Sequence, residues 1–152
     1  MFKKVPILIF FFLIFFVSFE DLYSKDEYFL TLRNEKVNLR QGPSFDYPVK
    51  ILYKKKFLPV LIQDSSDNFR KIRDHENNSG WVHISQLSKK KAAIVTEEEL
   101  ILFSNSSIFS NPVALLKEGR LVKISKCKTK WCKVKTGKYK GWVSKNGLWG
   151  LF

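Results

Sequence analysis

The tripeptide Gly-Trp-Val occurs twice in this chain, at residues 80–82 and again at 141–143, and the same features precede both copies. A Pro-Val pair at 48–49 returns 64 positions later at 112–113. An internal period of this length indicates duplicated structural units, so it constrains the fold before any other pattern. The spacing between corresponding residues falls from 64 to 61 along the unit, which places short deletions in turns. Two copies of one small unit therefore fill most of the chain.

The alternation of apolar and polar residues indicates the fold class. The expected strands of the first unit are short, and turns rich in Gly, Pro, Asn, Asp or Lys separate them; they lie at 29–32, 37–40, 49–53, 57–63, 69–73 and 81–84. No stretch between them has the spacing of an amphipathic helix. Short, evenly spaced strands are typical of small all-β barrels. We therefore predict two small barrels in tandem, at residues 29–88 and 92–152.

The first 24 residues have the pattern of an export signal. Lys3 and Lys4 are followed by an apolar run from Val5 to Phe19, which resembles the charged and apolar regions of a secretory signal. A transmembrane helix needs about 20 apolar residues, so this run is short for a permanent anchor. We expect residues 1–24 to be a signal peptide or an N-terminal anchor. The rest of the chain is then exported to the periplasm, either free or tethered to the inner membrane by an uncleaved leader.

The opening of the first unit resembles a known family. The sequence Val-Asn-Leu-Arg-Gln-Gly-Pro-Ser at 37–44, with Pro-Val at 48–49 and Gly-Trp-Val at 80–82, resembles the bacterial SH3 (SH3b) domain. The resemblance implies an SH3-like barrel used as a targeting or binding module in exported proteins, often beside cell-wall enzymes. The second unit lacks the Arg and the Gly-Pro at 101–107, which puts any ligand use of that loop in doubt. Its later motifs are similar to those of the exported tandem SH3-like proteins of alphaproteobacteria.

The two cysteines of the chain, Cys127 and Cys132, flank a four-residue loop and should lie on opposing strands. In an exported chain this arrangement favours a disulfide. A structural metal site needs more soft ligands, and the two histidines, His75 and His83, lie in the other unit without matching spacing. A redox pair is also disfavoured, because the spacing is not Cys-x-x-Cys beside a helix. We expect a disulfide, with no metal and no cofactor.

We expect no enzyme. Nucleophilic catalysis needs a nucleophile with a base and an orienting group, and glycoside hydrolysis needs paired carboxylates in a cleft. The chain has no Gly-x-Ser-x-Gly motif, and the acidic run at 97–99 has the pattern of a solvated turn before a strand. After the leader and two barrels, no length remains for a catalytic domain.

Positive charge is concentrated in the second unit. The net charge of the chain is +13, and residues 89–152 carry fourteen Lys and Arg against four Glu. Such a charge favours anionic partners, among them lipid headgroups, wall polymers and nucleic acid. A general richness in Lys is the alternative explanation. We do not expect a nucleic-acid partner, because the leader removes the chain from the cytoplasm.

Two functions remain. The first is a non-catalytic binding module of the cell envelope that recognises peptidoglycan or a wall-associated protein. The second is a structural or assembly adaptor of the envelope that contacts a protein partner and an anionic membrane surface. Candidate contacts are aromatic side chains and one histidine, for each of which packing in the core is the alternative role: Tyr47, Tyr53, Trp81, His83, Tyr139 and Trp142.

Overall fold

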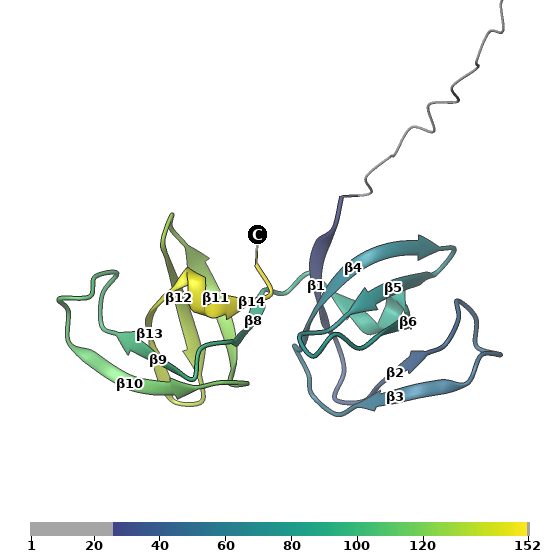
Figure 1. The fold of residues 1–152 in the computed structure, drawn as a ribbon, viewed down its shortest axis with the longest axis horizontal. Helices are drawn as coiled ribbons and strands as arrows, with labels where there is room; N and C mark the ends of the chain where they lie inside the picture. Colours follow the sequence, from purple (N-terminus) through teal and green to yellow (C-terminus); the bar gives the residue numbers. More distant parts are fainter. Residues whose placement is uncertain (1–25, 152) are drawn as a thin grey trace, which may run out of the picture.

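A computed structural model describes residues 26–151, and the expected leader at 1–24 lies outside the described residues. This part of the chain forms two seven-stranded antiparallel sheets and no α-helix, which confirms the predicted fold class (Figure 1). The first sheet contains β1 (Tyr28–Leu32), β2 (Val37–Arg40), β3 (Val49–Tyr53), β4 (Pro59–Ser66), β5 (Phe69–Arg73), β6 (Ser79–His83) and β7 (Leu87–Ser88). The second contains β8 (Ala92–Val95), β9 (Glu99–Phe103), β10 (Pro112–Lys117), β11 (Leu121–Cys127), β12 (Trp131–Thr136), β13 (Tyr139–Ser144) and β14 (Leu148–Trp149). Two short 3-10 helices, η1 (Ile84–Gln86) and η2 (Lys145–Gly147), precede β7 and β14.

The two sheets have the same topology. The strand order is β3-β2-β6-β5-β4-β1-β7 in the first and β10-β9-β13-β12-β11-β8-β14 in the second. Each strand of the first barrel therefore has its counterpart seven strands later. The registers also match, since Arg40 pairs with Trp81 and Phe103 pairs with Trp142. The repeat in the sequence is a repeat of the whole barrel.

Alternating side chains fill each core. In β2, Val37 and Leu39 are buried while Asn38 between them is exposed, as the period of two in a strand requires. The first core contains Leu32, Val37, Leu39, Tyr53, Leu58, Val60, Ile62, Ile72, Val82, Leu87 and Ile94. The second contains Ala93, Val95, Leu100, Leu102, Leu116, Val122, Cys132, Val134, Val143 and Leu148. All strands lie within residues 28–149, and Leu151 also packs against the second core, so residues 26–151 carry the packing that stabilises both barrels.

The glycine of the Gly-Trp-Val repeat allows two strands to approach closely. A Cβ atom on Gly80 would lie 2.6 Å from the carbonyl oxygen of Arg40 and 2.8 Å from Cγ of Leu39. Gly141 has the same neighbours in the second barrel, the carbonyl of Phe103 and the side chain of Leu102. Real Cβ atoms do not occupy such positions, so only glycine lets β6 cross β2, and β13 cross β9, at this distance.

Several strand boundaries differ by one to three residues from the sequence prediction, and one difference has a clear cause. The strand expected at 57–63 begins at Pro59, because Phe57 adopts a left-handed backbone with φ of 64°. The second barrel has Gly119, with φ of 75°, in the corresponding turn. The Phe57 ring lies 5.5 Å from Nζ of Lys90 in the linker and 4.5 Å from Nζ of Lys123 in β11. These cation–π contacts across the barrels offset the cost of the strained backbone.

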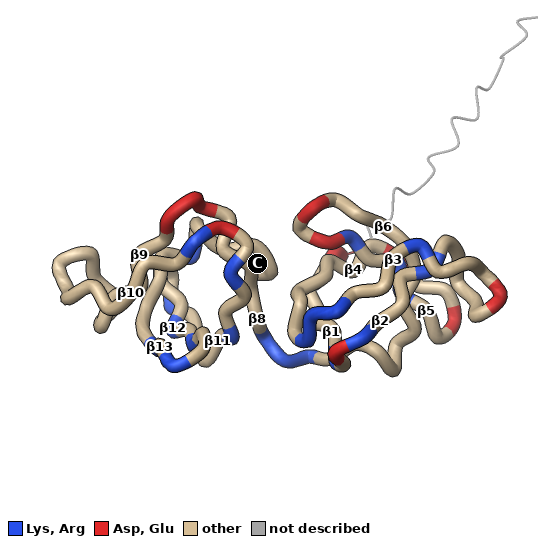
Figure 2. The backbone as a smooth tube through the Cα atoms, turned by 90° about the horizontal axis from the view of Figure 1, so that it is seen from below, with Lys and Arg blue, Asp and Glu red and all other residues tan. Residues whose placement is uncertain are grey.

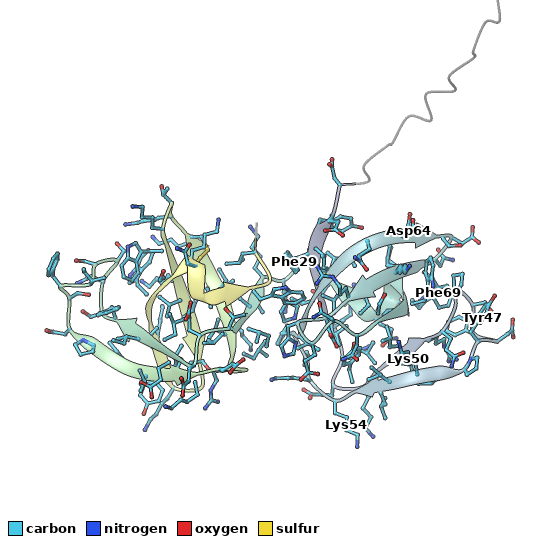
Figure 3. The ribbon with its side chains drawn as sticks, viewed as in Figure 1. Phe29, Tyr47, Lys50, Lys54, Asp64 and Phe69 are labelled. Atoms are coloured by element: carbon cyan, nitrogen blue, oxygen red, sulfur yellow. A yellow bond between two sulfur atoms is a disulfide. The ribbon has the colours of Figure 1, made fainter. Side chains whose placement is uncertain are left out.

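The two barrels are joined by the three-residue linker Lys89–Lys91 and pack directly on each other. The ring of Phe29 in β1 meets the ring of Trp149 in β14 edge to face, with centroids 4.9 Å apart. Figure 3 shows Phe29 on the side of the first barrel that faces the second. Ile94 of β8 belongs to the core cluster of the first barrel. The interface therefore joins the two cores through β1, β8 and β14.

A disulfide joins Cys127 and Cys132, which confirms the predicted pairing. The two residues lie directly opposite each other on β11 and β12. Cys132 is fully buried in the second core, and Cys127 is exposed. A cross-link around so short a loop stabilises the fold by about 2 kcal/mol. Its position fixes the hairpin that connects these two strands.

Within residues 26–151, the structure contains no helix of the length and apolar character that crossing a membrane requires.

The glycine contact gives a first prediction. Replacing Gly80 with Ala, or Gly141 with Ala, should lower the free energy of unfolding by about 1–3 kcal/mol, because the new methyl group meets a backbone carbonyl that has no room to move. Urea denaturation of residues 26–152 measures the change. Ser79→Ala is a suitable contrast, since Ser79 lies in the same strand at a position where a Cβ atom is already accommodated. Equal stability of the Gly80→Ala variant and the parent would contradict the proposed role of this glycine.

Candidate binding grooves

A groove of about 380 Å³ lies at the edge of the first barrel, between the β2–β3 loop (residues 41–48), strand β5 and η1. It is lined by Lys36, Asn38, Arg40, Phe45, Leu52, Phe69, His83, Ser85 and Gln86. Figure 3 places Phe69 and Tyr47 at the end of the first barrel away from Phe29. The groove is therefore remote from the interface between the barrels.

The Val-Asn-Leu-Arg-x-Gly motif shapes this groove through its arginine and glycine. Nη1 of Arg40 donates to the carbonyls of Phe45 at 3.1 Å and Tyr47 at 2.8 Å, which fixes the loop. A Cβ atom on Gly42 would come within 2.6 Å of ring carbons of Tyr47, so the glycine lets this ring lie on the backbone. The motif therefore holds the loop in one shape.

Three rings form one wall of the first groove. The centroids of Phe45, Phe69 and His83 are 5.1–5.2 Å apart in each pair. Nδ1 of His83 lies 2.7 Å from Oγ of Ser85 and accepts from its backbone N–H at 3.3 Å, which caps η1. The imidazole is thereby held in place. This wall presents aromatic faces beside the guanidinium of Arg40, whose Cζ lies 5.5 Å from the Phe45 ring.

The second barrel has a groove of about 590 Å³ in the corresponding place. It is lined by Glu99, Leu100, Ile101, Phe103, Ile108, Lys130, Trp131, Ser144 and Asn146. The strand registers relate the two grooves, because Phe69 pairs with His83 and Trp131 pairs with Ser144. Phe103 occupies the position of Arg40, opposite the repeated tryptophan. One structural position therefore carries a groove in both barrels.

The chemistry of the second groove is different. Phe103 replaces the guanidinium with a ring, and its centroid lies 5.8 Å from that of Trp131. The β9–β10 loop, residues 104–111, is held by Oγ of Ser110, which donates to the carbonyl of Ser107 at 2.7 Å. This loop has neither the arginine nor the glycine of the first, as the sequence indicates. The second groove is the more apolar of the two.

A family model for the bacterial SH3 domain matches residues 33–89 and, separately, residues 98–150. The matches cover more than half of the chain, with one in each barrel. The chain belongs to the bacterial SH3 domain family. No curated protein matches it.

Two solved structures similar to this bacterial SH3 protein are NlpC2 and NlpC1, both from Trichomonas vaginalis. NlpC2 is 13% identical, with a TM-score of 0.37, over 84% of this chain and 49% of its own. NlpC1 is 14% identical, with a TM-score of 0.37, over 82% of this chain and 46% of its own. The chain thus spans about half the length of these two proteins.

The predicted contact residues are spread over different places. His83 lines the first groove, and Tyr47 is an exposed part of its loop. Trp81 is half-buried beside Arg40, and Tyr139 is exposed at the β12–β13 turn, outside both grooves. Trp142 is only 7% exposed. The sequence analysis missed Arg40, Phe45, Phe69, Phe103, Ile108 and Trp131 as groove residues. The recurrence of Phe69 as Trp131, 62 positions later, is a signal for these two residues alone.

The structure places Tyr53 in the first core, which is the alternative role that the sequence analysis gives for it. Its side chain is 9% exposed and belongs to the first core, so its ring is not available as a surface contact. Its hydroxyl donates to Oδ2 of Asp74 at 2.8 Å. Asp74, itself 1% exposed, also accepts from the backbone N–H groups of Glu76 and Asn78. Burial, and then the hydrogen bond to Asp74, raise the pKa of Tyr53 well above its ordinary value.

Among residues 26–151, no three His, Cys, Asp or Glu side chains converge in the manner of a metal site.

Tyr53→Phe should lower the free energy of unfolding at pH 7 by about 1–3 kcal/mol, because a buried carboxylate loses a donor. The raised pKa also fixes the sign of the pH dependence. Above pH 10 the unfolded chain ionises Tyr53 while the folded protein does not, so stability from this residue is lost as the pH rises. The difference between parent and variant should therefore shrink above pH 10. Denaturation of both proteins at pH 7 and pH 11 measures it, and a difference that grows with pH would contradict this account.

Proposed function

We propose that this bacterial SH3 protein is a non-catalytic binding module of the cell envelope that recognises peptidoglycan or a wall-associated protein through its two grooves. One observation carries the proposal: equivalent positions build a groove in both barrels, and each groove combines aromatic walls with a few polar groups. Apolar and aromatic walls with a few polar groups are the usual make-up of ligand sites. Glycan and peptide chains carry both apolar faces and polar groups, and such walls can bind both.

The position of the grooves supports a linking role. The β2–β3 loop and the β9–β10 loop project from opposite ends of the molecule (Figure 1). The interface through Phe29 and Trp149 holds the barrels together between them. Two sites held apart in this way engage two separate points of a polymer network or of two partners. We propose that binding at both ends strengthens attachment through effective concentration.

The proposal assigns no catalysis to the grooves. The pair His83 and Ser85 resembles the start of a nucleophile–base arrangement, because its side chains are 2.7 Å apart. However, Nδ1 of His83 also accepts from the backbone N–H of Ser85, so this contact is a helix cap. The second barrel has Ser144 and Asn146 at the same positions, where neither residue is a general base. The two barrels share one scaffold but differ in these side chains, which favours ligand recognition over catalysis.

We further propose that the protein is exported to the periplasm, either free or tethered to the inner membrane by its leader. The disulfide supports this location, because disulfides persist in oxidising compartments. The protein would then be of the exported tandem type found in alphaproteobacteria. In that compartment nucleic acid is not an expected partner.

The second candidate function is an envelope adaptor that contacts a protein partner and anionic lipid. The fourteen Lys and Arg against four Glu in residues 89–152 favour it. Both functions share the envelope location and a lack of catalysis. They differ in which surface makes the primary contact.

Co-sedimentation with purified peptidoglycan sacculi tests the groove proposal. Residues 26–152 should co-sediment at moderate salt, and Phe45→Ala combined with Ile108→Ala should weaken binding roughly tenfold, because each change removes an apolar groove wall. Both side chains are largely exposed, so the substitutions leave the cores intact.

Tyr139→Ala provides the matched control, because Tyr139 is exposed and lies outside both grooves. It should bind sacculi as the parent does. Full recovery of the parent in the supernatant at low and moderate salt would contradict peptidoglycan as the ligand. Equal weakening by the groove variant and by Tyr139→Ala would contradict the grooves as the site.

A further inference from the structure

Three lysines surround one tryptophan on the outer surface of the second barrel. Nζ atoms of Lys128, Lys126 and Lys133 lie 4.9, 5.7 and 5.8 Å from the ring centroid of Trp142. Strand register explains the cluster, since Lys126 pairs with Lys133 and Lys133 pairs with Trp142. Val143, the next residue, belongs to the core, so Trp142 points outward and is covered by the lysine side chains. We call these four residues the basic face.

No carboxylate balances the basic face within residues 26–151. The four acidic residues of the second barrel lie in the β8–β9 turn, at the first residue of β9 and in the β10–β11 turn, where the N–H of Glu118 donates to the carbonyl of Glu98. These turns are at the opposite end of the β9–β10 hairpin from residues 104–111. Figure 2 shows the red acidic segments of this barrel on one side and the blue segments of β12 and β13 on the other. Directly opposed like charges destabilise a sheet, and a bound anion offsets that cost.

The equivalent position of the first barrel does not carry this excess of positive charge. There the corresponding row is Asp64, Lys71 and Trp81, in which an acid pairs with the lysine. In the second barrel Lys126 stands where Asp64 stands in the first. A general richness in lysine does not explain an acid at one copy of a position and a base at the other. The basic face is therefore a property of the second barrel.

Two exposed apolar residues, Ile108 and Phe109, lie next to the basic face, and we call them the apolar tip. Phe109 is 92% exposed and Ile108 is 66% exposed at the end of the β9–β10 loop. The loop touches the basic face, because Nζ of Lys128 is 3.5 Å from Oγ of Ser106. In the first barrel Asp46 occupies the position of Phe109, since each loop is closed by an equivalent bond, from Gln41 to Pro48 and from Ser104 to Asn111. The second barrel thus has an exposed ring where the first has a carboxylate.

We infer that the tip and the basic face together dock on the surface of an anionic phospholipid bilayer. Phe109 inserts at the boundary between headgroups and acyl chains, and the lysines contact lipid phosphates. A soluble polyanion would satisfy the lysines but would leave the apolar ring in water. Only a partner with both an anionic surface and an apolar layer uses both features. This inference deepens the adaptor function and rests on it for the location at the envelope.

Vesicle flotation with residues 26–152 tests the docking. The protein should float with vesicles that mix phosphatidylglycerol and phosphatidylcholine, should not float with phosphatidylcholine alone, and should be released by added salt. Lys126→Gln, Lys128→Gln and Lys133→Gln together should lower the partition coefficient about a hundredfold, since each lysine contributes near an anionic surface. Phe109→Asp, which introduces the type of residue found in the first barrel, should lower it at least roughly tenfold.

The matched control removes the same charge elsewhere, by Lys54→Gln, Lys71→Gln and Lys89→Gln. Lys71 is the counterpart of Lys133 in the first barrel. This variant should lose much less vesicle binding, and circular dichroism should show that all variants are folded. Equal loss from the two triple variants would overturn the inference, because net charge alone would then drive binding. The inference would also be overturned if Phe109→Asp left vesicle binding unchanged and the parent protein bound soluble polyphosphate as tightly as it binds anionic vesicles.

The two proposals fail in different ways. The single groove variant Phe45→Ala should weaken sacculi binding and keep its vesicle binding, since it leaves Ile108 and Phe109 of the tip unchanged. The basic-face variant should show the reverse. Parent protein that fails to float with anionic vesicles yet binds sacculi would overturn the membrane inference and leave the groove proposal standing.

Discussion

The close approach of β6 to β2, and of β13 to β9, is the contact on which the rest of the structure depends. Glycine at 80 and 141 allows it, because any side chain there would meet the backbone carbonyl of Arg40 or Phe103. This crossing brings Trp81 opposite Arg40 and Trp142 opposite Phe103. Arg40 lines the first groove and Phe103 lines the second, while Trp142 belongs to the basic face. The same backbone contact thus positions the groove of each barrel.

The two barrels keep this scaffold and change what it presents. At the groove, a guanidinium and an imidazole in the first barrel correspond to a phenyl ring and a hydroxyl in the second. At the loop tip and on the outer sheet face, two carboxylates correspond to Phe109 and Lys126. Strand pairing tolerates these changes because the altered side chains point away from the cores. Duplication followed by such changes gives one chain two grooves of different chemistry.

The two barrels pack against each other and are held in a fixed arrangement. The linker is only three residues long, and the rings of Phe29 and Trp149 meet across the interface. Phe57 has a left-handed backbone, and in this conformation its ring lies near Lys90 and Lys123. As a result, the two loops project from opposite ends of the molecule. The two grooves are thereby held at a fixed separation.

The sequence by itself determined the duplicated all-β architecture, most strand positions and the disulfide, because alternation, turn residues and the repeat are local patterns. It also indicated the excess charge of the second unit, but not which lysines converge on Trp142. Only the tertiary structure decided that Tyr53 is buried against Asp74 and that Phe45, Phe69 and His83 share one wall. Those outcomes depend on strand register and on which face of each strand meets the core. Such contacts join residues that are distant in the chain, and no local pattern specifies them.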